Sequence, residues 1–230
     1  FIKENSAYFM SLNRGKESIA LNLKKSEDKK IFLNILNKTD VLVENFKPGT
    51  LEKWGLGWKD LCSKFPKLIY ASASGFGQTG PLKELPAYDM VVQGMGGLMS
   101  VTGHPQTEPT RVGTSIGDIT AALFTTIGIN SALYDREKTG KGMFIDVSML
   151  DCQIAILENA IARYLSKNEI PQPMGSRHPS IAPFEAFKTK DSYIIIAAGN
   201  DKLFEKLCNA LDMKAEFNNE KFKTNSLRCK

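Results

Sequence analysis

The sequence predicts an α/β protein. It has a large domain with an open, Rossmann-like parallel sheet, followed by the start of a smaller α+β domain. Two patterns predict this class. In the first two thirds of the chain, short apolar segments that suit strands alternate with helical segments, an order that forms parallel sheets through right-handed crossovers. Near the end, two strand patterns and one helical pattern follow a proline-rich stretch, as expected for a second, smaller unit.

The first elements form a strand–helix–strand unit. Residues 18–23 alternate apolar and polar side chains, which predicts a strand. Ser26 is a candidate N-cap for a helix that continues to Leu36. Residues 40–45 predict a short buried strand that ends in polar residues. In open α/β sheets, ligands bind outside the carboxyl ends of the strands, so the residues after this strand are expected at a binding edge.

The middle of the chain continues the alternation. Short helices are expected at residues 50–54 and 58–61, and a third strand at residues 68–74. That strand leads into a glycine-rich loop at residues 75–81. The loop has neither the Lys-Ser/Thr of a P-loop nor the spacing of a dinucleotide fingerprint, so it is weak support for phosphate binding.

Further elements follow in the same style. A helix is predicted over residues 88–97, where two glycines end it, and a longer helix follows Gly117-Asp118. Residues 143–148 predict another strand and residues 150–165 one strongly periodic helix.

The end of the chain predicts a change of domain. Residues 1–167 are expected to form the catalytic α/β domain, residues 168–183 a linker, and residues 184–230 the start of the small domain. In the last part, a hairpin turns around Lys190-Asp191, and Asp201 caps a helix. The chain begins on phenylalanine and stops without a closing element, so we expect it to be an internal piece of a longer protein.

Composition excludes several classes of function. The net charge is +5 and there is no block of five like charges, which argues against a nucleic-acid-binding arm and suits a small anionic ligand. The four cysteines are widely spaced with no Cys-x-x-Cys, which predicts a reducing, cytoplasmic environment and no zinc ribbon. No signal peptide and no membrane-spanning apolar run is expected, and therefore no membrane partner.

Asp118 is the candidate catalytic residue. It follows Gly117 at the mouth of a predicted helix, where free backbone N–H groups and the helix dipole favour a carboxylate. One interpretation is an N-cap aspartate. The other is a nucleophilic carboxylate, approached closely by a substrate because Gly117 has no side chain.

Other polar residues carry weaker signals. Lys24, Lys47 and Lys53 flank predicted strand ends, either as solvated lysines or as contacts to one phosphate-bearing ligand. Phe46 is either a core residue or part of an apolar surface that binds a flat ring of the ligand. His104 and His178 lack neighbours at ligand spacing, so no metal site is expected.

For three further acids and for one pair of basic residues, a structural role is the simpler interpretation. Asp146, Asp151 and Glu158 are expected to be solvated or salt-bridged. Arg177 and His178 suit either a structured linker or a second carboxylate-binding group, which would indicate a dicarboxylate substrate.

Five motifs in order resemble the class III CoA-transferase family, of the CaiB/BaiF type, which includes formyl-CoA and carnitine CoA-transferases. They are Val-Glu-Asn-Phe-Lys-Pro-Gly from residue 43, Ser-Gly-Phe-Gly-Gln-Thr-Gly-Pro from 74, Ala-Tyr-Asp from 87, Gly-Asp at 117 and Thr-Gly-Lys-Gly from 139, the last followed by Asp-Val-Ser-Met. The resemblance covers the whole chain. It implies an open α/β domain with a smaller domain, in two subunits interlocked as a homodimer.

The resemblance also implies roles for particular residues. Asp118 matches the nucleophile, and Tyr8 is a candidate to line the substrate pocket. The formyl-CoA transferase lysine that matches Pro86 is absent here, which argues against formate as substrate. Positions that match CoA or substrate contacts are Leu21, Asn22, Leu23, Lys24, Asn45, Phe46, Lys47, Lys53, Ala87, Tyr88 and Asp89.

The implied reaction moves CoA from an acyl-CoA to a free carboxylic acid through an aspartyl anhydride and an aspartyl-CoA thioester, with oxyanions held by N–H groups of glycine-rich loops. It needs no cofactor besides the CoA thioester that serves as substrate. Two alternatives remain. An acyl-CoA racemase is disfavoured because its histidine position holds Tyr88, a poor base near neutral pH. A CoA-binding protein without turnover is the other.

Overall fold

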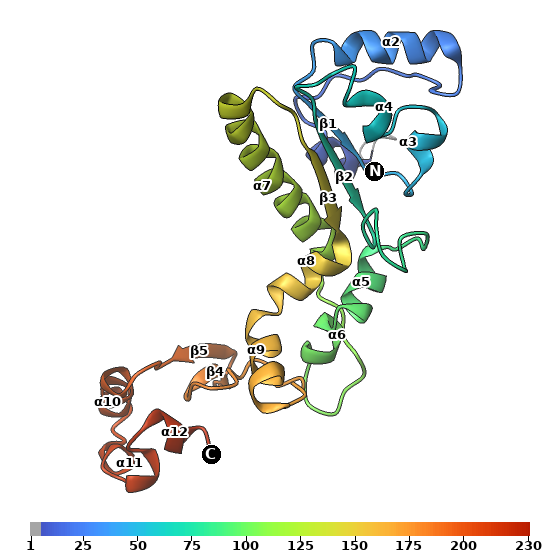
Figure 1. Cartoon of the computed structure of the whole chain (residues 1–230). Helices are drawn as coiled ribbons and strands as arrows, with labels where there is room; N and C mark the ends of the chain where they lie inside the picture. The colour runs from blue at the N-terminus through green and yellow to red at the C-terminus, as the bar shows by residue number, and fades with distance from the viewer. Residues whose placement is uncertain (1–5) are drawn as a thin grey trace. The chain divides into compact units, whose positions relative to one another are not determined.

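The computed structural model describes residues 6–230 (Figure 1). The chain divides into two compact units. The first consists of Phe1–Ser72 and Ile127–Ile145, and the second of Ala73–Thr126 and Asp146–Lys230. The predicted division into residues 1–167, 168–183 and 184–230 stays a prediction.

The predicted parallel sheet is present and the α/β class is confirmed. Strands β1 (Val41–Glu44), β2 (Ile69–Ser74) and β3 (Phe144–Ser148) pair in the order β1-β2-β3 (Figure 1). β1 and β2 run parallel, with Val41 opposite Ile69. β2 is buried along almost its whole length, as expected for a central strand covered on both faces.

The first unit contains four short helices before β2. Leu23 lies half-buried against the hydrophobic core, just before the longest of them. The four helices are α1 (Ala7–Leu12), α2 (Ser26–Leu36), α3 (Thr50–Lys53) and α4 (Trp58–Leu61).

Two predictions for the start of the chain were wrong. Residues 18–23 form no strand and run as irregular chain. Their alternation has another cause, because Leu21 and Leu23 are half-buried while the residues between and before them are exposed. The N-cap of α2 is Lys25, one residue before the predicted Ser26, and it makes no side-chain capping bond.

The second unit consists of short helices and one antiparallel hairpin. Its hairpin pairs β4 with β5, as predicted, with Phe184 opposite Ala197. Its remaining elements are α5 (Asp89–Met95), α6 (Leu98–Val101), α8 (Met149–Ile156), α9 (Glu158–Lys167), β4 (Phe184–Lys188), β5 (Tyr193–Ala197), α10 (Asp201–Ala210), α11 (Lys214–Phe217), η1 (Glu220–Phe222) and α12 (Asn225–Arg228).

Two helix boundaries in this unit differ from the prediction. The single helix expected over residues 150–165 is two helices, because Leu157 leaves helical geometry at φ −86° and ψ 27°. The N-cap of α10 is Asn200, not Asp201, since its side chain accepts the Leu203 N–H at 3.0 Å.

Helix α7 (Ile116–Thr139) is the longest helix of the described residues and runs through both units. By length and composition alone it could cross a membrane, contrary to the expectation that no such run exists. Only 28% of its most apolar stretch is buried. One such helix is weak support for a membrane span, because core helices of soluble proteins pass the same test.

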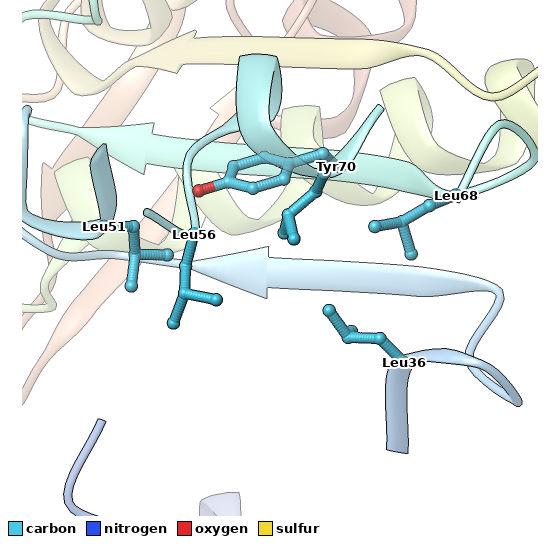
Figure 2. Packing of buried hydrophobic residues seen from close by; sticks show 6 residues of the cluster. Leu36, Leu51, Leu56, Leu68 and Tyr70 are labelled. Carbon is cyan, nitrogen blue, oxygen red and sulfur yellow. The ribbon is translucent and has the colours of Figure 1, made fainter. Parts of the chain in front are cut away.

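The hydrophobic core of the first unit lies against β2 (Figure 2). Trp58 stacks on Phe144 with ring centroids 6.0 Å apart, and Tyr70 lies edge-on to Trp58. Burying each leucine contributes about 1.5–3 kcal/mol to stability. Because Tyr70 of β2 belongs to this core, the packing holds β2 in place. The fully packed members of the core are Leu36, Leu51, Leu56, Leu61, Leu68 and Tyr70.

Candidate active site

Asp118 lies in the first turn of α7. The helix begins two residues earlier, and the Ile119 N–H donates to the Ser115 carbonyl at 3.0 Å. Asp118 is therefore the third helical residue, and the N-cap interpretation is wrong for it. Its side chain is exposed while it keeps the favourable electrostatic position at a helix N-terminus.

Gly117 allows α7 to begin directly against α5. A Cβ at this position would lie 2.7 Å from Cγ2 of Val92 and 3.0 Å from Oδ1 of Asp89. The Gly117 N–H donates to that same Asp89 oxygen at 2.7 Å. The missing side chain thus serves helix packing, whereas the sequence suggested close approach of a substrate.

Asp89 is the acid that the structure brings to Asp118. Although Asp118 is exposed, the partial burial of its carboxyl raises the pKa of that group, and the nearby Asp89 carboxylate raises it further. Both effects disfavour the charged form. A reaction that converts the Asp118 carboxylate into a neutral ester or anhydride relieves both, so the position suits a nucleophilic carboxylate.

A buried glutamine completes the contacts of Asp89. Gln93, four residues along α5, donates from Nε2 to Oδ2 of Asp89 at 2.8 Å. Its Oε1 accepts the Val112 N–H at 2.9 Å, in the loop that leads to Gly117. The sequence interpretation missed Gln93. The available signal was a glutamine at i+4 from an acid within an apolar run, which places both on one helix face.

The glycine-rich loop after β2 is held by Asp146. Both oxygens of Asp146 accept the Gln78 N–H at 3.0 Å, and a Cβ on Gly77 would lie 3.4 Å from Oδ1. Gly77 has φ +78°, which favours glycine. Asp146 is therefore exposed, as expected, and in addition anchors the loop, so the Gln78 N–H is committed to it instead of to an oxyanion.

The turn after β1 is fixed by a buried carboxylate. Oε2 of Glu44 accepts the Phe46 N–H at 2.7 Å, and the Ser72 hydroxyl donates to Oε1. Phe46 lies edge-on to Trp54 with centroids 5.8 Å apart, yet 45% of it is exposed. Asn45 and Lys47 are also exposed. These three predicted CoA contacts thus face solvent on a rigid turn.

The other predicted contacts of the first unit lie on its surface. The Asn22 N–H donates to Asp28 at 2.7 Å, and the Lys24 N–H donates to the Asn22 side chain at 3.1 Å. These bonds shape the turn that enters α2. Lys24 is exposed, as is Lys53 at the end of α3. Tyr8, on α1, is 69% exposed.

In the second unit, Ala87 and Tyr88 precede Asp89 at the start of α5. A Cβ on Gly75 would lie 2.4 Å from Cβ of Ala87, so the glycine-rich loop packs closely against this segment. Tyr88 is the N-cap residue of α5 and is 82% exposed. The structure therefore groups Ala87, Tyr88, Asp89 and Asp118 in one unit, and the remaining candidates in the other.

The Arg177-His178 pair lies in an ordered turn. Nδ1 of His178 accepts the Ser180 N–H at 3.1 Å, and its ring contacts Phe184. Arg177 donates to the Cys229 carbonyl at 3.3 Å and, with Arg163, lines a cavity of about 240 Å³. The contacts of His178 favour the structured-linker interpretation. No cluster of three metal-ligating side chains occurs among residues 6–230.

Comparison with known proteins decides the family. The model of CoA-transferase family III matches residues 1–230. The chain belongs to CoA-transferase family III. The acetyl-CoA:oxalate CoA-transferase of Acetobacter aceti is 49% identical over 212 residues, 92% of this chain and 54% of that protein. The human succinyl-CoA:glutarate CoA-transferase is 41% identical over 228 residues, 99% of this chain and 52% of that protein.

A solved structure of the same family shows the same fold. A CaiB/BaiF family protein from Brucella suis superposes with a TM-score of 0.83 at 42% identity, covering 97% of this chain and 59% of that chain. The family III chain described here spans about half the length of the curated relatives it matches. The resemblance stated from the motifs is thus confirmed.

Proposed function

We propose that the protein is a CoA-transferase that moves CoA from an acyl-CoA to a free carboxylic acid, with Asp118 as the nucleophile. The observation that carries this proposal is the geometry of Asp118 in a chain of this family. It is an exposed carboxylate in the first turn of α7, with a raised pKa and a second acid beside it.

The first half of the proposed reaction transfers CoA to the protein. A carboxylate oxygen of Asp118 attacks the acyl carbon, the carbon–sulfur bond breaks, and CoA leaves as a thiolate. The product is a mixed anhydride. The thiolate then attacks the Asp118 carbonyl carbon, the donor acid leaves as its carboxylate, and an aspartyl-CoA thioester remains.

The second half mirrors the first. The acceptor carboxylate attacks the thioester, releases the thiolate and forms a second anhydride with Asp118. The thiolate attacks the acyl carbon of the acceptor, which forms the new acyl-CoA and restores the Asp118 carboxylate. Each step exchanges one activated acyl bond for another, so the reaction needs no external energy source or redox partner.

We propose a dicarboxylate as the acceptor. Two of the most similar relatives have names that contain oxalate and glutarate, both dicarboxylates. The test is a panel of acceptor acids with succinyl-CoA and acetyl-CoA as donors, in the full-length protein that carries this chain. We expect CoA transfer to dicarboxylates in preference to monocarboxylates of similar length.

Two outcomes would contradict the proposal. Transfer to monocarboxylates with the same kcat/KM as to dicarboxylates would contradict the proposed acceptor class but not the proposed CoA transfer. Exchange of the α-proton of an acyl-CoA in deuterium oxide, without acid-dependent transfer, would indicate a racemase instead.

A further inference from the structure

Gln93 is a buried amide with both ends engaged. It is fully buried, its Nε2 donates to Asp89 and its Oε1 accepts from the Val112 N–H. The orientation of the amide follows from its partners, because a carboxylate only accepts and a backbone N–H only donates. A buried group of this kind is held firmly, since an unpaired end would be desolvated without a compensating hydrogen bond.

The contacts of Gln93 reach both ends of the loop that leads to Asp118. At one end Gln93 holds the Val112 N–H directly. At the other end it holds Asp89, whose second oxygen accepts the Gly117 N–H at 2.7 Å. Gly117 is covalently joined to Asp118. Residues 113 and 114 between them are exposed, so the placement of this loop depends on its two ends.

We propose that Gln93 is a positioning residue that fixes the Asp118 carboxylate. It acts through the Val112 end of the loop and through the orientation of Asp89. This inference rests on the proposed function, in which Asp118 is the reacting group. Gln93 is fully buried, so in this proposal it acts through Val112 and Asp89 and not on the substrate. Because a misplacement of about 1 Å can cost roughly 100-fold in rate, the two bonds should matter more for turnover than for acyl-CoA binding.

Two substitutions separate positioning from packing. Gln93→Met keeps the length of the side chain and removes both hydrogen bonds. Gln93→Glu keeps the shape of the side chain and makes its hydrogen bonds to Asp89 and Val112 depend on pH. A protonated carboxyl can donate to Asp89 and accept from Val112, like the amide, whereas an ionised one cannot donate and repels Asp89.

The control is Gln153→Met. Gln153 is also fully buried, but its Nε2 donates to the Thr120 hydroxyl and it has no bond to Asp89 or to Val112. It reports the effect of removing a buried amide that reaches the first turn of α7 through Thr120, whose hydroxyl donates to the Ile116 and Gly117 carbonyls, and not through Asp89 or Val112.

The experiment measures kcat and KM from pH 5 to 9 in the full-length protein, and hydrogen exchange in the peptide that contains residues 112–118. We expect Gln93→Met to lower kcat by about 10–100-fold with little change in the KM for acyl-CoA. Exchange of the Val112 and Gly117 amides should be faster than in the wild type. The kcat of Gln93→Glu relative to wild type should be highest at acid pH and fall as pH rises.

Other results would overturn the inference. If Gln93→Met lost activity only in proportion to the unfolded fraction, or without faster exchange of the Val112 and Gly117 amides, Gln93 would be a packing residue. If the kcat of Gln93→Glu relative to wild type did not vary with pH, the hydrogen bond that Gln93 donates to Asp89 would have no role in turnover. The exchange measurement needs no catalysis, so unchanged exchange contradicts this inference even if Asp118 proved not to be the nucleophile.

Discussion

Asp118 and Asp89 are neighbouring acids whose negative charges repel each other. The proposed attack needs the ionised form of Asp118, so activity should fall as pH drops through its pKa. Burial raises this pKa most and Asp89 raises it further. Asp89→Asn removes the charge and also one of the two oxygens that accept from Gly117 and Gln93. We therefore expect a lower kcat together with an acid limb of the kcat/KM profile at lower pH, which does not reach the value of a free aspartate.

The matched control for this profile is Asp151→Asn. Asp151 lies in the first turn of α8 and is exposed, and the pKa of Asp118 carries no contribution from it. An acid limb that stays in place in Asp89→Asn, or moves equally in the control, would mean that Asp118 does not control the rate.

Gly117 is tested by adding one methyl group. In Gly117→Ala the new carbon would meet Val92 at 2.7 Å and the bonding oxygen of Asp89 at 3.0 Å. Overpacking of this kind costs about 1–3 kcal/mol, partly offset by the higher helix propensity of alanine, about 1 kcal/mol. We expect a lower midpoint in urea unfolding and a lower kcat. Gly128→Ala, elsewhere in α7, would place the new carbon 3.0 and 3.7 Å from two methyl groups of Ile145, and no polar partner among the described residues is near it. Because the Ile145 side chain can shift, we expect a smaller change in both quantities.

The residue scale also shows where sequence reasoning reaches its limit. The Gly-Asp motif made Asp118 a candidate, and its role as the nucleophile, which the family resemblance implies, stays a prediction. The contact of Gly117 with Asp89, 28 residues apart, could not be predicted, because it depends on how α5 and α7 pack. The role of Gln93 depends on the same packing.

At the scale of elements, short buried strands and tight turns were predictable. The three strands of the sheet and the β4–β5 hairpin follow from apolar runs and turn residues. Residues 18–23 were wrongly predicted as a strand, because alternation reports which side chains are buried and not whether a neighbouring strand is there to pair. Leu157 broke a predicted helix without a proline or glycine, so no local signal marked it.

The exposed lysines near the strand ends provide the test at this scale. Lys24 and Lys53 face solvent, and CoA carries several phosphates. We expect Lys24→Ala and Lys53→Ala to raise the KM for acyl-CoA by a few-fold, with a smaller effect on kcat, and the effect to shrink at high salt. Lys59→Ala, on an exposed position of α4, is the control. Equal KM values in all three variants would make these lysines ordinary surface charge.

At the scale of the whole molecule, the chain spans about half the length of the curated relatives it matches. The candidate CoA contacts between residues 21 and 53 belong to the first compact unit, whereas Ala87, Tyr88, Asp89 and the candidate nucleophile Asp118 belong to the second. The interlocked homodimer and the cytoplasmic location stay predictions. Activity should therefore be measured in the full-length protein.

The most direct test of the account is the covalent intermediate on Asp118. The full-length protein is incubated with acyl-CoA, treated with hydroxylamine, digested and analysed by mass spectrometry. We predict acyl-CoA-dependent modification of Asp118 alone. Asp118→Asn should lose both modification and transfer, because an amide cannot form the anhydride. Its unfolding midpoint should change little, because the two side chains have the same shape and the position is exposed. Modification of Asp146 or Asp151 instead, or full transfer activity in Asp118→Asn, would contradict the account.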